Sequence, residues 1–190
     1  MWERLLQWDR ETFIYLNSQG VAAYDSFWCS VTEIYNWIPL FLFFIGLLFF
    51  KFPRREAISR LITLLVLVVF ITLLTYFTKI TVARPRPNND LEINGLIRIL
   101  KTPTDYSFFS GHAASSFSIT VLVCLFLFRR WKWALLFFVW PVLFSWSRIY
   151  VGVHFPLDII TGALVGTSIG FLCYYLHYRF TIPGSRLSHL

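Results

Sequence analysis

Residues 57–77, AISRLITLLVLVVFITLLTYF, decide the class of fold. An α-helix needs about 20 predominantly apolar residues to cross the hydrocarbon core of a bilayer, and Arg60 is the only charged residue in this stretch. Residues 156–178 form a second run of that length. Three shorter runs approach it together with polar neighbours that would face other helices: 35–50, 113–128 and 133–150. We therefore expect an all-α, polytopic membrane helix bundle with about five to six transmembrane helices.

The composition agrees with a membrane protein of one domain. Of the 190 residues, 57% are hydrophobic and 14% are charged, whereas a soluble domain carries about 25% charged residues. The length is that of a single domain, residues 1–190. The net charge of +7 fits basic loops and anionic lipid, so the expected partner is the bilayer and not nucleic acid. The scattered Cys29, Cys124 and Cys173 indicate neither a disulfide framework nor a metal cluster.

Residues 1–30 form an amphipathic segment before the first span. Charged residues interrupt the apolar positions of MWERLLQWDRETFIYLN, which argues against a secretory signal peptide. At helical spacing the large apolar side chains fall mostly on one side: Trp2, Leu5, Leu6, Trp8, Phe13 and Ile14. A helix lying in the membrane interface fits this pattern, and a helix packed on the rest of the bundle fits it about as well.

The basic residues of the loops predict the orientation of the chain. A five-span arrangement leaves nearly equal numbers of Lys and Arg on the two sides, but short loops carry more weight than long ones. The tight turn RRWK (129–132) therefore marks the cytoplasmic side, together with Arg179 and Arg186. The loops 78–110 and 147–156 then share the outer face. We expect a multi-pass protein of the cytoplasmic (inner) membrane of a bacterium, with a site facing the periplasm or the exterior.

Three polar segments lie at the outer ends of these spans, where they can converge. They are KITVARPRP (79–87), SFFSGHAASSF (107–117) and SRIYVGVHFPLD (147–158). A charge within a bilayer costs roughly 2.5–3.5 kcal/mol on insertion scales, so charges beside apolar runs indicate function. Singly, these residues have ordinary structural explanations, such as an arginine that snorkels or a serine that caps a helix. Their convergence from three segments favours a functional site.

The residue types are those of a phosphate site. Lys79, Arg86 and Arg148 supply fixed cations, and arginine presents a planar fork that suits phosphate oxygens. Ser110 precedes a predicted helix start, where the amides of Gly111 and His112 would form an anion-binding nest.

A nucleophile and its partners complete the predicted site. Pro156 suits the first turn of a helix, so Asp158 falls within that turn and can reach a ring nitrogen of His154. Asp158 would fix the tautomer of His154, whose other nitrogen can attack phosphorus to give a phosphohistidine. His112 can protonate the leaving oxygen and later activate water. Since the cations neutralise the transition state, we expect no metal and no cofactor.

In these three segments the sequence resembles the type 2 phosphatidic acid phosphatase (PAP2) family, membrane relatives of the vanadium haloperoxidases. The family patterns are Lys-x6-Arg-Pro, Pro-Ser-Gly-His and Ser-Arg-x5-His-x3-Asp, and only the proline of the second is replaced, by Phe109. The resemblance implies a PAP2/haloperoxidase-like helical core and a metal-independent lipid phosphatase. It implies that His154 is the nucleophile, His112 the acid and base, and Asp158 the orienting group. It also implies that five residues bind phosphate: Lys79, Arg86, Ser110, Gly111 and Arg148.

The substrate stays open among lipid phosphates and diphosphates. The short chain and the outward site resemble small bacterial enzymes that act on undecaprenyl diphosphate; phosphatidylglycerol phosphate, phosphatidic acid and lipid A are alternatives. A lipid phosphotransferase would need the same residues. A non-catalytic lipid-binding or transport protein and a haloperoxidase are further alternatives. The loop 88–104 is either a lid, in which Arg98 and Lys101 touch a second phosphate, or a solvated loop.

Overall fold

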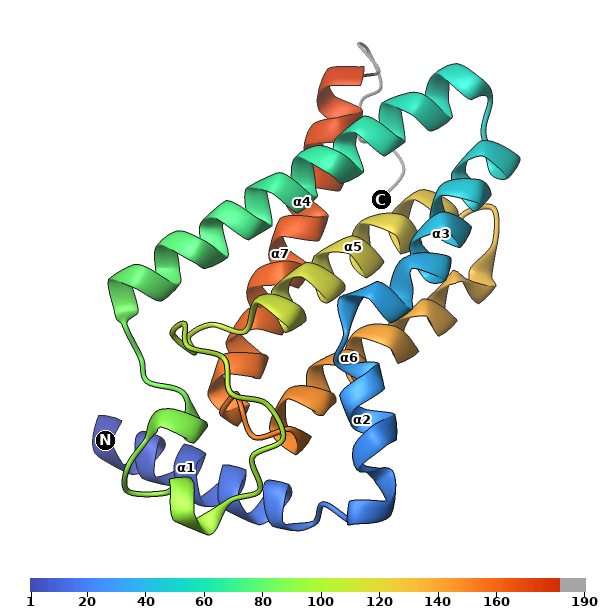
Figure 1. Ribbon diagram of the computed structural model, residues 1–190. Coiled ribbons are helices and arrows are strands. Elements are labelled where there is room, and N and C mark those ends of the chain that lie inside the picture. Colours follow the sequence, from blue (N-terminus) through green and yellow to red (C-terminus); the bar gives the residue numbers. More distant parts are fainter. Residues whose placement is uncertain (182–190) are drawn as a thin grey trace.

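The computed structural model describes residues 1–181, which form helices joined by loops and contain no β-strand (Figure 1). The α-helices are α1 (Trp2–Ser18), α2 (Asp25–Val31), α3 (Ile38–Lys51), α4 (Arg54–Val82), α5 (Gly111–Leu127), α6 (Val139–Tyr150) and α7 (Pro156–Thr181). Short 3₁₀ turns cover Ala22–Tyr24, Ile34–Trp37, Pro87–Asn89, Asn94–Leu96 and Lys132–Phe138. The predicted all-α fold class is confirmed.

The predicted apolar runs all become helices. Four helical stretches are long and apolar enough to cross a membrane: Ile34–Lys51, Arg54–Asn89, Lys132–Tyr150 and Pro156–Phe180. The fifth run forms α5, which has only 17 residues. The chain is therefore a multi-pass membrane protein with α5 as its shortest apolar helix.

One predicted boundary is wrong. The outer loop was expected at 78–110, but α4 continues to Val82, and Ala83 ends it in a left-handed conformation with φ of 50°. The amide of Ala83 donates to the carbonyl of Lys79, so Lys79 lies in the last helical turn. The first polar segment therefore starts on a rigid helix and only then enters the loop.

The helix α5 lies in the middle of the bundle, between α4, α6 and α7 (Figure 1). Most of its residues are buried, and they join the main apolar core with Phe44, Leu48, Leu67 and Phe144. The outer side of α4 instead exposes large apolar residues, among them Val66, Val69, Phe70 and Leu73. Such a surface suits lipid tails, which solvate apolar side chains as the protein core does.

Small residues let α7 approach α5 closely. A Cβ on Gly162 would lie 2.6 Å from the carbonyl oxygen of Ser110, and one on Gly166 would collide with the carbonyl of Ala114. Small residues at such crossings are a usual way for membrane helices to pack. This crossing joins α5, which Ser110 caps, to the helix that carries Asp158.

Gly166→Val is expected to lower the melting temperature in detergent, because the new side chain meets the backbone of α5. Overpacking costs about 1–3 kcal/mol or more where a backbone must move. Gly46→Val is the matched control, since a Cβ on Gly46 meets nothing within 4 Å. The fraction of monodisperse protein left after heating measures both variants, and equal melting of the two would contradict the close approach.

The helix α1 presents two different faces. Asp9, Phe13 and Asn17 point inward and are buried, whereas Trp2 and Trp8 are exposed. The apolar residues were expected to fall mostly on one side, and Phe13 is an exception, because its ring packs edge-on against Phe155 with centroids 5.3 Å apart. The helix thus packs on the bundle through a face with buried polar groups. It leaves an aromatic face outside, of the kind that membrane interfaces accommodate.

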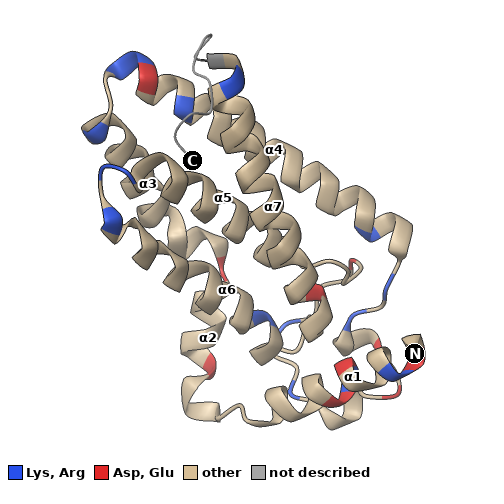
Figure 2. Ribbon diagram, turned by 180° about the vertical axis from the view of Figure 1, so that it is seen from behind, with Lys and Arg blue, Asp and Glu red and all other residues tan. Residues whose placement is uncertain are grey.

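Charged residues divide between the two ends of the bundle (Figure 2). The turns α3–α4 and α5–α6 carry Lys51, Arg54, Arg55, Arg130 and Lys132, and Glu56 is the acidic residue at that end. The opposite end, with α1 and the loop 83–110, carries both signs of charge. Arg186, expected on the basic side, lies outside the described residues.

Candidate active site

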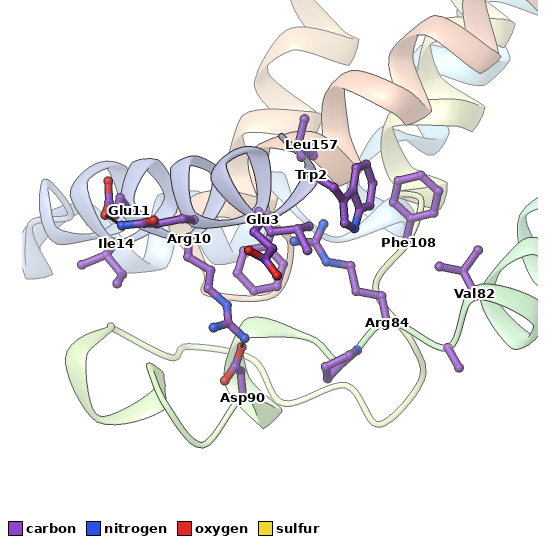
Figure 3. Close-up of a pocket in the computed structure, with 15 residues that line it drawn as sticks. Trp2, Glu3, Arg10, Glu11, Ile14, Val82, Arg84, Asp90, Phe108 and Leu157 are labelled. Atoms are coloured by element: carbon purple, nitrogen blue, oxygen red, sulfur yellow. Dashed lines mark hydrogen bonds and ion pairs between the residues drawn. The ribbon is translucent and has the colours of Figure 1, made fainter.

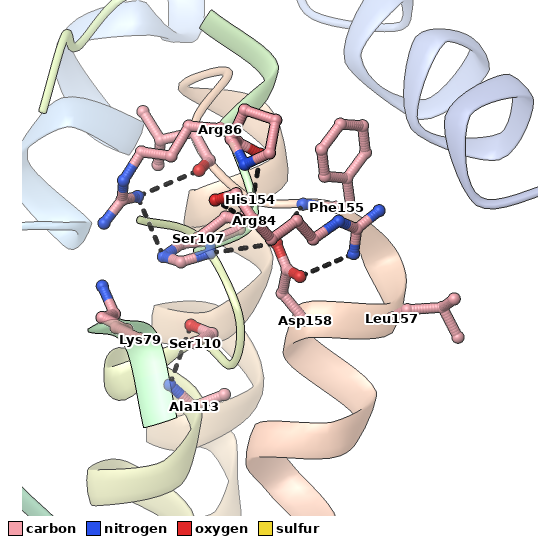
Figure 4. Close-up of polar contacts among 12 residues, drawn as sticks. Lys79, Arg84, Arg86, Ser107, Ser110, Ala113, His154, Phe155, Leu157 and Asp158 are labelled. Atoms are coloured by element: carbon pink, nitrogen blue, oxygen red, sulfur yellow. Dashed lines mark hydrogen bonds and ion pairs between the residues drawn. The ribbon is translucent and has the colours of Figure 1, made fainter. Parts of the chain in front are cut away.

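The three polar segments meet in one place (Figure 4), at the end of the bundle opposite the basic turns (Figure 2). They come from the last turn of α4 with the loop after it, from the first turn of α5, and from the turn between α6 and α7. The amide of Ser110 donates to the carbonyl of Asp158 at 2.9 Å, which ties the start of α5 to the first turn of α7.

His154 lies in the turn before α7 and is buried. Its Nδ1 lies 3.3 Å from Oδ2 of Asp158, and its Nε2 lies 3.1 Å from a guanidinium nitrogen of Arg86. Arginine only donates hydrogen bonds, so Nε2 must be the acceptor and the ring proton must be on Nδ1. Burial, followed by the charge of Arg86, holds the pKa of His154 well below its ordinary value. The ring is therefore neutral at pH 7, with the free electron pair on Nε2.

Asp158 lies in the first turn of α7, which begins at Pro156 as predicted. It is fully buried. Besides His154, its Oδ2 accepts from the amide of Phe155 at 3.0 Å, and its Oδ1 accepts from Arg84 at 2.7 Å. Three donors therefore fix the orientation of this carboxylate.

The cationic cluster consists of Lys79, Arg86 and Arg148. Lys79 and Arg86 both bond the carboxylate of Asp105, at 2.5 Å and 2.7 Å. Arg148, at the end of α6, donates to the hydroxyl of Thr32. Its buried Nε has no hydrogen-bond partner among the described residues. A buried guanidinium nitrogen without an acceptor is suited to an incoming anion.

The start of α5 has the geometry expected from the sequence. Ser110 is the N-cap and accepts from the amide of Ala113 at 3.4 Å, while Gly111 and His112 are the first helical residues. The ring of His112 packs on that of Phe144, with centroids 4.7 Å apart. It lies within electrostatic reach of Lys79, Arg86, Arg148 and His154. The phosphate nest and the acid–base role of His112 stay predictions.

Residues 60–182 match the PAP2 superfamily, which is more than half of the chain. The chain belongs to the PAP2 superfamily.

Relatives with this PAP2 architecture act on different lipids. The undecaprenyl-diphosphatase of Sulfolobus acidocaldarius is 34% identical over 175 residues, covering 90% of this chain and 79% of that protein. The lipid A 4'-phosphatase of Bacteroides thetaiotaomicron is 28% identical over 187 residues, covering 95% and 82%. The crystal structure of a PAP2 type phosphatidylglycerolphosphate phosphatase from Bacillus subtilis matches with a TM-score of 0.75, covering 96% of this chain and 90% of that one. At 20% identity it supports the fold alone.

The sequence patterns did not identify every residue that the fold brings to this site. Asp105, Arg84 and Thr32 contact predicted site residues, and Asp9 contacts Arg84. Asp105 and Arg84 lie in the polar segments or beside them, so their charge was a signal. Asp9 and Thr32 precede the family match and reach the site only through tertiary contacts. Among the described residues, no group of three His, Cys, Asp or Glu side chains is arranged to hold a metal ion.

The loop after η-turn Pro87–Asn89 is tied to the N-terminal helices. Arg98 pairs with Asp25 at 2.7 Å, and Lys101 pairs with Glu33 at 2.7 Å. Their cationic groups are thus engaged by carboxylates of the N-terminal segment and do not join the cationic cluster. The expectation that they touch a second phosphate gains no support from this geometry.

A cavity of about 730 Å³ lies beside the site, between α1, the end of α4 and the start of α7 (Figure 3). Its lining is mostly apolar and includes Trp2, Leu6, Val82, Phe108 and Leu157. Arg84 and Phe155 line it from the side of Asp158, whereas His154 and the cationic cluster do not. The cavity is therefore separate from the predicted phosphate position.

Asp105→Asn is expected to bind inorganic phosphate about tenfold more tightly, because the Asp105 carboxylate occupies two cations that an anion would need. Burial raises the pKa of Asp105, but the bond from Lys79 and the charges of Arg86 and Lys79 outweigh it, so its pKa lies below the ordinary value. The carboxylate therefore stays charged and competes at neutral pH. The inhibition constant of phosphate measures this effect, with Glu33→Gln as control; unchanged or weaker inhibition in Asp105→Asn would contradict the competition.

Proposed function

We propose that the protein is a metal-independent lipid phosphatase that hydrolyses a phosphate monoester or diphosphate of a lipid through a phosphohistidine. The observation that carries this proposal is the arrangement of His154. Its Nδ1 faces Asp158 at 3.3 Å, and its Nε2, which holds the free electron pair, faces Arg86 at 3.1 Å. The nucleophilic nitrogen is thus directed at the cations that would hold the phosphate oxygens.

The first step transfers the phosphoryl group to His154. Phosphate oxygens of the substrate take the hydrogen bonds that Arg86 and Lys79 make with His154 and Asp105. Nε2 then attacks phosphorus, the P–N bond forms, and the P–O bond to the lipid breaks with its electron pair going to the lipid oxygen. His112 enters this step with both ring nitrogens protonated, gives one proton to that oxygen and is left neutral. Asp158 accepts from Nδ1–H and stabilises the cationic ring.

The second step returns the enzyme to its starting state. Water attacks phosphorus, and His112 takes a proton from it. The P–N bond breaks, its electron pair returns to Nε2, and inorganic phosphate leaves. In both steps Lys79, Arg86, Arg148 and the amides at Gly111 face the charge on the equatorial oxygens, which is where phosphoryl transfer needs stabilisation.

Undecaprenyl diphosphate is the substrate that we propose first. The support is the 34% identity to an undecaprenyl-diphosphatase over 90% of this chain. The relative that acts on lipid A makes lipid A 4'-phosphate the second candidate. Phosphatidylglycerol phosphate and phosphatidic acid carry the same phosphate group and complete the set to be tested.

We also propose that the site faces the periplasm or the exterior, in the cytoplasmic (inner) membrane of a bacterium. The turns α3–α4 and α5–α6 are short and gather Lys and Arg, with Glu56 as their acidic residue (Figure 2). Short basic loops stay in the cytoplasm. The site lies at the opposite end, where the cations are paired with carboxylates.

Phosphate release from four lipids tests the proposal. Purified protein in detergent, with excess EDTA, is given undecaprenyl diphosphate, lipid A, phosphatidylglycerol phosphate and phosphatidic acid. We expect release that survives EDTA, fastest with undecaprenyl diphosphate. Loss of release in EDTA would contradict the metal-independent reaction. Absence of release from all four by folded protein would contradict the phosphatase and favour a lipid-binding protein.

A further inference from the structure

The N-terminal helix reaches the site through one buried carboxylate. Asp9 of α1 and Asp158 of α7 are both fully buried, and Arg84 lies between them. Arg84 donates to Oδ2 of Asp9 at 2.5 Å. It also donates to Oδ1 of Asp158 at 2.7 Å (Figure 4). Its guanidinium also lies over the ring of Phe155, 4.1 Å from the centroid. One arginine, held on three sides, therefore joins the two carboxylates.

We propose that Asp9 and Arg84 are positioning residues for the reaction at His154. They hold the Asp158 carboxylate toward the ring, and the group formed by Asp9, Arg84 and Asp158 keeps a net negative charge. This inference rests on the proposed function. Neither residue touches the cationic cluster through a hydrogen bond in the described part of the chain, so their effect on the reaction runs through Asp158. They join the N-terminal helix, which precedes the PAP2 match, to the reacting histidine.

The charges of the group explain why two carboxylates are needed. A single arginine bonded to Asp158 would neutralise it, and a neutral pair would stabilise a cationic ring only weakly. Two carboxylates and one guanidinium leave one negative charge in a buried place. That charge matches the positive charge that appears on the ring of His154 when its Nε2 is phosphorylated. Asp9 thus balances the positive charge of Arg84, so that the negative charge of Asp158 is not neutralised.

A second bond of Asp9 fixes the helix that carries Asp158. Its Oδ1 accepts from the amide of Leu157 at 2.8 Å. The first amides of a helix have no partner within the helix, so a carboxylate there is stabilising. Asp9 therefore holds both the arginine and the first turn of α7. Arg84 and Leu157, which both bond Asp9, also line the cavity in Figure 3.

Asp9→Asn removes the charge with almost no change in size. We expect kcat to fall about 10- to 100-fold, the size usual for a group that orients a reacting group from behind, and KM to stay within about twofold. The acidic limb of kcat/KM should move to lower pH, because the loss of a negative charge makes His154 less basic. The charged and titratable groups around His154 come from every element packed against it. They are Asp9, Lys79, Arg84, Arg86, Asp105, His112, Arg148 and Asp158.

Three further variants make the test decisive. Asp9→Glu keeps the charge and should keep the wild-type acidic limb. Glu92→Gln is the matched control, because Glu92 is exposed and bonds Arg10, the neighbour of Asp9 in α1. This substitution should leave the kinetics unchanged. Should Asp9→Asn fail to fold, Arg84→Lys is expected to give the same loss of kcat at constant KM.

The outcomes separate this inference from the proposed function. Wild-type kinetics of Asp9→Asn would overturn the inference, and so would a lower melting temperature with an unshifted acidic limb, which indicates a structural role. The proposed function is judged on other measurements, namely phosphate release by the wild type and its loss in His154→Ala. A wild type that releases phosphate beside an unaffected Asp9→Asn would therefore reject the positioning role alone.

Discussion

Replacing His154 by alanine is expected to lower phosphate release by about 10⁴-fold or more, because the proposed nucleophile is removed and little else at the site changes. His154 is buried, but the cations that would bind phosphate come from other elements, and Lys79 and Arg86 keep their bonds to Asp105 when Arg86 loses its contact with the ring. The affinity for the lipid should therefore fall only a few-fold. Phosphate release at saturating lipid, together with equilibrium binding of the lipid to the variant, measures the two effects separately.

A trapped intermediate makes this prediction specific to a phosphohistidine at His154. Substrate labelled at the phosphoryl group should leave label on the wild type after rapid alkaline quenching, since phosphohistidine survives base and is lost in acid. His177→Gln is the matched control, because His177 of α7 bonds Thr63 of α4 at 2.7 Å. This variant should keep full activity and full labelling. Label that persists in His154→Ala, or activity near the wild-type rate, would reject His154 as the nucleophile.

The spans and the site segments were predictable because their signals are local. Residues 57–77 hold too many apolar side chains in sequence for a soluble helix, and α4 follows from that run. The cap at Ser110 and the helix start at Pro156 depend on a few adjacent residues, and both lie where expected. The spacing between His154 and Asp158 fixes their distance once α7 begins at Pro156.

Contacts between distant segments were not predictable in this way. The end of α4 depends on one residue, Ala83, that takes a left-handed conformation without being glycine. The inward face of α1 was hidden because Asp9 and Asn17 are polar and look like solvent-facing residues in a sequence. They are buried because Arg84 and the carbonyls of Ile149 and Tyr150 satisfy them. Asp105 likewise gains its importance only when Lys79 and Arg86 both turn toward it.

His112→Asn is expected to lower the hydrolysis of an alkyl lipid phosphate by about 10²- to 10⁴-fold, the usual contribution of a positioned acid or base. Asparagine keeps a polar side chain of smaller size but cannot transfer a proton. The loss should depend on the leaving group, because an alkoxide needs a proton as it departs and p-nitrophenolate does not. With p-nitrophenyl phosphate the first step should therefore survive in the variant.

Rapid mixing of His112→Asn with p-nitrophenyl phosphate distinguishes the two steps. We expect a burst of p-nitrophenol equal to the enzyme concentration, followed by slow turnover, since the second step still lacks the base that activates water. Ser115→Ala is the control, because Ser115 lies one turn along α5 and its hydroxyl bonds the carbonyls of Gly111 and His112. An equal loss of activity on both substrates, without a burst, would show that His112 binds or positions phosphate and does not transfer the proton. A burst with p-nitrophenyl phosphate, together with the loss of activity on the alkyl lipid phosphate, would assign both proton transfers to His112.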